Sequence, residues 1–234
     1  MRIAVALCFV FVLGATNCKH QAPSKDRATT SEAQKGSCFA DGQLSNALRD
    51  LASGDPPKVD QANSELLNKS KLSAKCRTEV VAALMQAMDK PNLDSNFDSS
   101  NFYLWRYGAE ILGDLKAAEA LDLLISHLNL HDPVFGSPLL SNHPAQLGVI
   151  TMGPIAIPKL GEALKHNGDP KIRYAAIYCI ANIGGQSAVS ALKEALVSES
   201  DECAKRLIQV SLDSFDEKGN IKNTAQWFGR FKCK

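Results

Sequence analysis

Apolar and polar positions alternate with helical spacing most clearly between Asp169 and Leu196. In the first half of this stretch the apolar residues recur three and four positions apart, as on one face of an α-helix: Ile172, Ala175, Ala176, Cys179, Ile180 and Ile183. Pro170 suits the first turn of this helix, and Gly184-Gly185 suits its end. Ser187 is the predicted N-cap of a second amphipathic helix. The stretch therefore predicts two short helices that pack as an antiparallel pair.

Weaker copies of this pattern precede the stretch. Four sets of residues take equivalent places in the copies: Gly108, Gly148 and Ala176; Leu112, Met152 and Ile180; Leu115, Ile155 and Ile183; Leu124, Leu160 and Leu192. The predicted helices are 105–115 with 117–130, 145–155 with 157–166, and a last amphipathic helix over 202–215. Because one helix pair buries its apolar faces poorly, we expect the copies to stack on a shared core.

The segments around the repeats complete the predicted organisation. Before the repeats, the pattern predicts helices over 39–51 and 59–67, a third helix with Ser73 as its N-cap, and a polar loop over 92–101. Within the repeats, 131–144 is predicted to be a long irregular connection whose apolar residues pack against the body. After them, Trp227, Phe228 and Phe231 are expected to cover the last apolar face. The predicted parts are a signal peptide (1–17), a disordered tether (18–37), N-terminal capping helices (38–91), helical repeats (92–215) and a C-terminal cap (216–234).

The segments IRYAAIYCIANIGGQSAVSALKEAL and MGPIAIPKLGEAL carry a family resemblance. They resemble the short HEAT-like repeats of bacterial proteins, which also occur in phycobilisome lyase families. An arginine often opens the first helix of such a repeat, and Arg173 matches it, whereas Trp105 and Ala145 stand at that place in the earlier copies. The resemblance implies an all-α fold, a right-handed α-α superhelix (a HEAT-like α-solenoid) of antiparallel helix pairs. No residue motif of the lyase activity can be carried across.

The N-terminus predicts export. Met1-Arg2 supplies a positive start, and 3–13 supplies an apolar core of signal-peptide length that is too short to span a bilayer. The residues before Cys18 resemble the lipobox of bacterial lipoproteins, in which the cysteine is lipidated, although Asn17 departs from that motif. The alternative is a soluble-secretion cleavage site. We expect a protein of the periplasm or cell envelope, with or without a lipid anchor at Cys18 and without a transmembrane helix in its mature form.

Five cysteines follow the tether, and an exported chain meets conditions that permit disulfides. Cys179 lies on the apolar face of its helix, so we interpret it as a buried thiol. The other four allow three connectivities. We predict the two local pairings, Cys38–Cys76 and Cys203–Cys233.

The chain offers little that indicates catalysis. Its formal net charge of +1 provides no electrostatic case for nucleic-acid binding. His127 and His131 lie four positions apart on a predicted helix, the spacing of two metal ligands, but the glutamate of zinc peptidases is missing between them. Two solvated histidines at a helix end explain them equally well. We predict no enzymatic activity, no cofactor and no metal.

The leading hypothesis is a monomeric, non-enzymatic scaffold that presents a concave face to an unidentified protein partner. On a helix, Phe102 and Trp105 share one face and Tyr103 and Tyr107 another, and one pair is expected on the surface, where tyrosines often anchor partners. The candidate contact residues are Tyr103, Arg106, Tyr107, Arg173 and Tyr174. Two alternatives stay open: a metal-binding or hydrolytic protein that uses His127 and His131, and a purely structural module.

Overall fold

The computed structural model describes residues 37–89, 99–131 and 142–222. By its internal contacts the chain divides into two units, and the described residues all belong to the second, Ser37–Lys234. The predicted signal peptide and nearly all of the tether, Cys18 included, lie outside the described residues. So does the end of the predicted C-terminal cap, which contains Trp227, Phe228 and Phe231.

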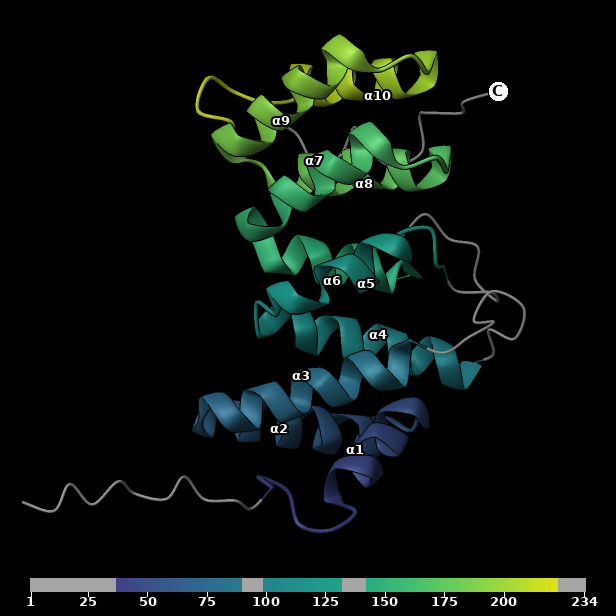
Figure 1. Cartoon of the computed structure of the whole chain (residues 1–234), viewed down its shortest axis with the longest axis vertical. Coiled ribbons are helices and arrows are strands. Elements are labelled where there is room, and N and C mark those ends of the chain that lie inside the picture. The colour runs from purple at the N-terminus through teal and green to yellow at the C-terminus, as the bar shows by residue number, and fades with distance from the viewer. Residues whose placement is uncertain (1–36, 90–98, 132–141, 223–234) are drawn as a thin grey trace, which may run out of the picture. The chain divides into compact units, whose positions relative to one another are not determined.

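The regular structure of the described residues is helical, apart from an isolated antiparallel bridge between Phe215 and Ile221 (Figure 1). The α-helices are α1 (Gln43–Ala52), α2 (Pro56–Leu72), α3 (Ala74–Met88), α4 (Ser99–Asp114), α5 (Leu121–Ser126), α6 (Pro144–Met152), α7 (Ile157–His166), α8 (Pro170–Ile183), α9 (Gly185–Ser198) and α10 (Glu202–Asp213). Short 3-10 helices, η1 (Ala118–Ala120) and η3 (Gly153–Ala156), precede α5 and α7.

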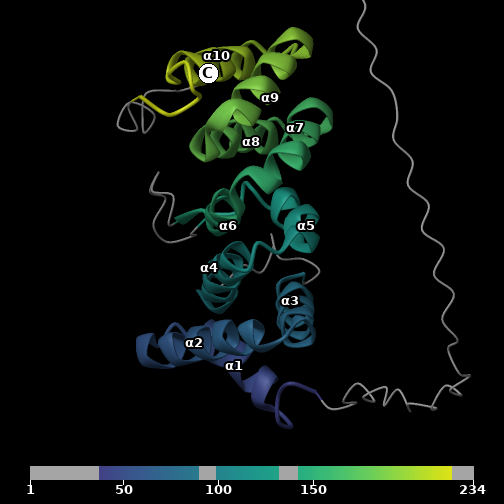
Figure 2. The same ribbon diagram turned by 90° about the vertical axis from the view of Figure 1, so that its left-hand side faces the viewer.

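From α4 onward the helices stack in two layers, which Figure 2 shows side by side. In one layer α4 contacts α6, α6 contacts α8, and α8 contacts α10. In the other layer α5 contacts α7, and α7 contacts α9. Contacts of α5 with α6, α7 with α8 and α8 with α9 join the layers. Helices α1, α2 and α3 pack on one another and on α4. The fold is therefore an all-α solenoid, as predicted.

The repeat positions read from the sequence mark the core. Leu112, Met152 and Ile180 are at most 1% exposed, and Leu124, Leu160 and Leu192 are fully buried. The set of Leu115, Ile155 and Ile183 does not lie in the core. Ile155 is 46% exposed, and Leu115 and Ile183 are only half-buried. Ile155 lies in η3, where the chain leaves α6 in a tight turn, so its side chain faces outward. Small residues at Gly108, Gly148 and Ala176 let neighbouring helices approach.

Several element boundaries differ from the predicted ones. Helix α1 begins at Gln43, because Gly42 at its N-cap adopts a left-handed conformation, and Phe39 packs before the helix. Helix α2 is longer than 59–67, because Pro56 and Pro57 form its first turn instead of ending a segment. Helix α4 begins inside the predicted loop 92–101, and the predicted helix 117–130 is broken into η1 and the short α5. Ser73 caps α3 as predicted, accepting from the Cys76 backbone N–H.

The glycine pair after α8 has a role beyond ending that helix. Gly184 and Gly185 both have positive φ, at 70° and 83°, and α9 begins directly at Gly185, so Ser187 is not the N-cap. The Gly185 N–H donates to the carbonyl of Gly219, at 2.8 Å. A Cβ at Gly219 would lie 2.6 Å from the Gly185 carbonyl carbon. The turn after α10 therefore closes onto the α8–α9 turn through backbone contacts.

One helical stretch of the described residues, Pro144–His166, is long and apolar enough by length and composition to cross a membrane. It comprises α6, η3 and α7. Within the stack, α6 contacts α4 and α8, and α7 contacts α8 and α9. Val149, Met152, Leu160 and Leu164 from this stretch are at most 1% exposed. Core packing of a solenoid accounts for its apolar composition.

Candidate functional site

The aromatic cluster on α4 divides between core and surface. Phe102 and Trp105 are buried, so they form the core pair of the two that the helix pattern distinguished. Tyr103 and Tyr107 are half-buried and stacked, with ring centres 6.5 Å apart and planes at 15°. The Arg106 guanidinium lies 5.6 Å from the centre of the Tyr107 ring. This second group is the part of the cluster that can reach a partner.

Tyr103 is partly committed to the protein's own packing. Its ring lies so close to Gly54, between α1 and α2, that a Cβ at Gly54 would overlap it. The sequence does not indicate this contact, because Gly54 lies in the connection between α1 and α2 and Tyr103 lies on α4. A partner-binding role for Tyr103, Arg106 and Tyr107 stays a prediction.

Arg173 and Tyr174 are engaged within the protein. The Arg173 guanidinium lies 3.5 Å from Glu199 Oε2 and 3.3 Å from Asp201 Oδ2 and donates to the Asn167 carbonyl, at 3.1 Å. The Tyr174 hydroxyl donates to Asp201 Oδ2, at 2.8 Å. Only 16% of the Arg173 side chain is exposed. These contacts tie α8 to the connection between α9 and α10, which gives both residues a structural role.

Asp201 contacts both Arg173 and Tyr174, and it was not among the site residues predicted from the sequence. Its Oδ1 accepts the backbone N–H groups of Cys203 and Ala204, at 2.8 and 3.0 Å, so it is the N-cap of α10. The hydrogen bond from Tyr174 lowers the pKa of Asp201 and raises the pKa of Tyr174. An aspartate directly before an amphipathic helix is the sequence signal for such a cap.

Replacing Asp201 with alanine is expected to lower the free energy of unfolding by about 1–2 kcal/mol at neutral pH, because the cap and the Tyr174 contact are lost together. The folded pKa of Asp201 is lowered, so its contribution is present above the unfolded-state value of about 3.9 and disappears as pH falls through the folded value. Chemical denaturation at pH 7 and near pH 2 measures the loss of unfolding free energy and its dependence on pH. Asp213→Ala, an exposed position on α10, serves as control. An equal loss at both pH values would contradict the assignment.

A groove of about 510 Å³ lies between the start of the described chain, α1 and α3. Its lining is mainly small and apolar, with a few polar groups at the edge: Ser37, Phe39, Ala40, Asp41, Gly42, Leu44, Ser45, Leu48, Ala83, Gln86 and Ala87. Sequence reasoning missed this groove, because its two walls are separated along the chain by the whole of α2. Leu44 and Leu48 on α1 are only half-buried, so the structure leaves part of the apolar face of this helix uncovered.

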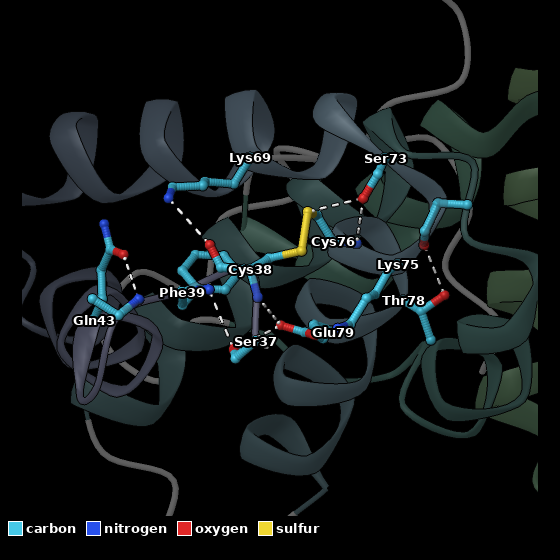
Figure 3. The surroundings of a disulfide bond; sticks show 12 residues. Ser37, Cys38, Phe39, Gln43, Lys69, Ser73, Lys75, Cys76, Thr78 and Glu79 are labelled. Carbon is cyan, nitrogen blue, oxygen red and sulfur yellow. Dashed lines mark hydrogen bonds and ion pairs between the residues drawn. A yellow bond between two sulfur atoms is a disulfide. The ribbon is translucent and has the colours of Figure 1, made fainter. Parts of the chain in front are cut away.

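The wall formed by the start of the chain is fixed to α3 (Figure 3). A disulfide joins Cys38 to Cys76, one of the two predicted pairs, with Cα atoms 5.4 Å apart. Glu79 Oε2 accepts both the Cys38 backbone N–H and the Ser37 hydroxyl, each at 3.0 Å. These hydrogen bonds lower the pKa of Glu79. On the other side, Lys69 Nζ donates to the Cys38 carbonyl and lies 5.5 Å from the centre of the Phe39 ring.

Two further cysteines, Cys179 and Cys203, lie among the described residues. Cys179 is a free thiol and fully buried, as its position on the apolar helix face predicted, and burial raises its pKa. Cys203 is disulfide-bonded. Cys233, its predicted partner, lies outside the described residues, so that pairing stays a prediction.

The structure does not pair the histidines that the sequence suggested. The His127 ring packs on Trp105, with ring centres 4.7 Å apart, and its Nδ1 lies 3.0 Å from the Leu123 carbonyl oxygen. His131 instead has its ring 6.1 Å from that of His143. Burial, with the neighbouring His131, lowers the pKa of His143. Among the described residues, no group of three or more His, Cys, Asp or Glu side chains is placed to hold a metal ion.

Stacked helix pairs around one core define the class of this protein as an α-solenoid. Residues 147–213 match the family model described as HEAT repeats. The match runs from α6 to the end of α10, and with the helical structure it supports a HEAT-like repeat protein. The α4–α5 pair lies outside the match, in keeping with the weaker pattern of that copy. No curated protein matches the chain. The likeness to repeats of phycobilisome lyase families stays a prediction.

Proposed function

We propose that this chain is a non-enzymatic, exported scaffold that binds a protein partner. Repeats of the HEAT type are commonly interaction scaffolds, which supports the general role. The Cys38–Cys76 disulfide supports export, because disulfides persist in oxidising compartments and are rare in the cytosol. The observation that carries the proposal is the groove between α1 and α3.

The groove suits apolar side chains of a partner segment. Phe39, Leu44, Leu48, Ala83 and Ala87 give it an apolar lining, and Ala83 with Ala87 leaves room above one face of α3. Its volume lies in the range in which pockets bury a few side chains of a ligand. Ala83 and Ala87 are one helical turn apart, so an amphipathic helix that presents residues with the same spacing fits against them.

The groove is also preorganised. The disulfide and the hydrogen bonds of Glu79 and Lys69 hold the wall at Cys38 and Phe39 in place before any partner binds. A wall that is already ordered does not lose conformational entropy on binding, which favours affinity. A pure structural module has no need of an ordered, uncovered apolar groove.

The layer of second helices, α5, α7 and α9, is the part that we assign to the concave face of the predicted superhelix. Ion pairs link its members: Asp122 with Lys159 at 3.0 Å, and Lys165 with Glu194 at 2.7 Å. Such exposed pairs contribute little to stability, so a charged partner can replace them at little cost. This layer is the second candidate surface for the same function.

Ala87→Glu is expected to reduce capture of the partner at least about tenfold, because a charge in the groove must be desolvated when apolar side chains enter. The measurement is quantitative crosslinking in cell-envelope fractions, with a photoreactive residue at the exposed Gln86. Ala163→Glu is the matched control: Ala163 is also a half-buried helical alanine, but it lies on α7, outside the groove.

Three outcomes separate the candidate surfaces. Loss of partner capture in Ala87→Glu alone supports the groove as the binding surface. Loss of partner capture in Ala163→Glu alone indicates that the partner binds the layer of second helices instead. Capture that is unchanged in both variants, with both proteins folded by circular dichroism, contradicts a scaffold that uses either surface.

A further inference from the structure

Two histidine side chains meet where the chain passes from α5 to α6. His131 follows the turn after α5, and His143 is the N-cap residue of α6. Their ring centres are 6.1 Å apart, and the ring planes are inclined by 37°. Two imidazoles that share one metal ion, with metal–nitrogen distances of about 2.0–2.1 Å, have their ring centres about 5–6.5 Å apart. The exposed His131 side chain can make the small shift that remains.

Each of the two rings has one nitrogen that makes no hydrogen bond within the protein and can serve as a ligand. His131 Nδ1 lies 3.2 Å from the Asn129 carbonyl oxygen, to which it can only donate, so its Nε2 keeps a lone pair. The buried Nδ1 of His143 has no hydrogen-bond partner. His143 therefore has an unpartnered ring nitrogen that a metal ion can bind. A backbone carbonyl on one nitrogen and a lone pair on the other is the arrangement of metal-bound histidines.

The backbone around the pair is fixed by buried contacts. The Gln146 side-chain amide, on the first turn of α6, donates to the Leu128 carbonyl at 2.8 Å, and the Gln146 residue is 8% exposed. Leu128 is fully buried. This bond ties the start of α6 to the turn that carries His131, so the two rings are brought together by rigid structure.

We propose that His131 and His143 form a binding site for a divalent transition-metal ion, with Cu²⁺ bound more tightly than Zn²⁺. Imidazole nitrogen suits copper, nickel and zinc, and Cu²⁺ has the highest affinity of the divalent first-row ions for a given nitrogen site. Water completes the coordination, because the site consists of two protein ligands. The site differs from the His127–His131 pair suggested by sequence spacing, since the His127 ring packs on Trp105, whereas the ring beside His131 is that of His143. It is also separate from the proposed partner groove.

The test is calorimetric titration of the untagged full chain with CuSO₄ and, separately, ZnCl₂. We expect one equivalent of Cu²⁺, with affinity at least about tenfold weaker in His131→Ala and in His143→Ala. The matched control is His166→Ala, an exposed histidine at the end of α7, which should leave the affinity unchanged. Electron paramagnetic resonance of the Cu²⁺ complex should show coupling to two imidazole nitrogens, and to one in either variant.

The controls keep a folding defect apart from ligand loss. His143 is half-buried at the start of α6, so thermal denaturation must show that His143→Ala is folded. If it is not, His131→Ala decides, because that side chain is exposed. The proposal is overturned if His131→Ala binds Cu²⁺ as tightly as the unmodified chain, if no stoichiometric binding occurs, or if His166→Ala causes the same loss.

Discussion

Gly148→Ala is expected to lower the free energy of unfolding by about 2–3 kcal/mol, although alanine is the better helix former. A Cβ at Gly148 would lie 2.6 Å from the Ala109 carbonyl oxygen and 3.1 Å from the Ala109 Cβ. Real Cβ atoms do not approach another atom so closely. The obstacle is backbone of α4, so no side-chain rotation relieves it, and α4 and α6 must move apart along their shared contact.

Gly161→Ala provides the matched control. Gly161 is also a buried glycine inside a helix of the stack, but a Cβ there would meet only the Ala191 Cβ, at 4.0 Å. We expect this variant to be neutral or to stabilise the protein by up to about 1 kcal/mol, because alanine has the higher helix propensity and reduces the entropy of the unfolded chain. Urea denaturation of both variants measures the difference. If Gly148→Ala were as stable as Gly161→Ala, the α4–α6 packing described above would be incorrect.

The contrast between Gly148 and Gly161 also shows what the sequence pattern does not predict. Both glycines lie at small-residue positions of amphipathic helices, and the repeat alignment places Gly148 beside Ala176. The alignment brings small residues together at this position, and the structure shows a close helix contact at Gly148. It did not predict that only glycine fits in α6 while alanine fits in α8, because that depends on how closely each pair of helices approaches.

The fold itself could be predicted from local signals. Helical spacing of apolar residues, with Ser73 and Pro170 at helix starts, predicted most of the described helices and the core leucines. The errors lie where a helix breaks for tertiary reasons. The predicted helix 117–130 instead begins as the 3-10 helix η1, after Lys116 with its positive φ of 50°, and it ends at Ser126, because His127 leaves the helical conformation.

The candidate sites were much less predictable, because their members come from separate elements. Arg173 and Tyr174 were selected as surface candidates, yet Asp201 and Glu199 bind them within the protein. Helical spacing suggested His127 as the neighbour of His131, whereas the structure places the His143 ring 6.1 Å from the His131 ring. Side-chain type predicts what a residue can bind, whereas the packing of distant segments determines what it does bind.

The second large effect concerns the disulfide. Replacing both Cys38 and Cys76 with serine is expected to destabilise the N-terminal helices by up to about 4 kcal/mol. The two cysteines are 38 positions apart, and the chain-entropy estimate for a closed loop of that length is about 4 kcal/mol at 25 °C. The loop contains α1 and α2, so the cross-link restricts the unfolded state of this region in particular.

The location of the effect is as diagnostic as its size. Each part of a solenoid contacts mainly its neighbours, so stability is distributed along the stack rather than shared by the whole. Loss of the disulfide should therefore accelerate amide hydrogen exchange in α1 and α2 far more than in α8 and α9. Hydrogen exchange with mass spectrometry measures this directly, and uniform acceleration along the described helices would contradict it.

A substitution that weakens the same wall without cutting the cross-link separates the two contributions. Glu79→Ala removes the acceptor for the Cys38 and Ser37 groups but leaves the disulfide in place. We expect a smaller loss of stability than in the double serine variant, because the entropy of the unfolded state is unchanged. Both variants should weaken partner capture, since each loosens the wall that carries Phe39. If the double serine variant instead kept the full unfolding free energy and groove binding, the hydrogen bonds of Glu79 and Lys69 would be sufficient to order this wall without the covalent link.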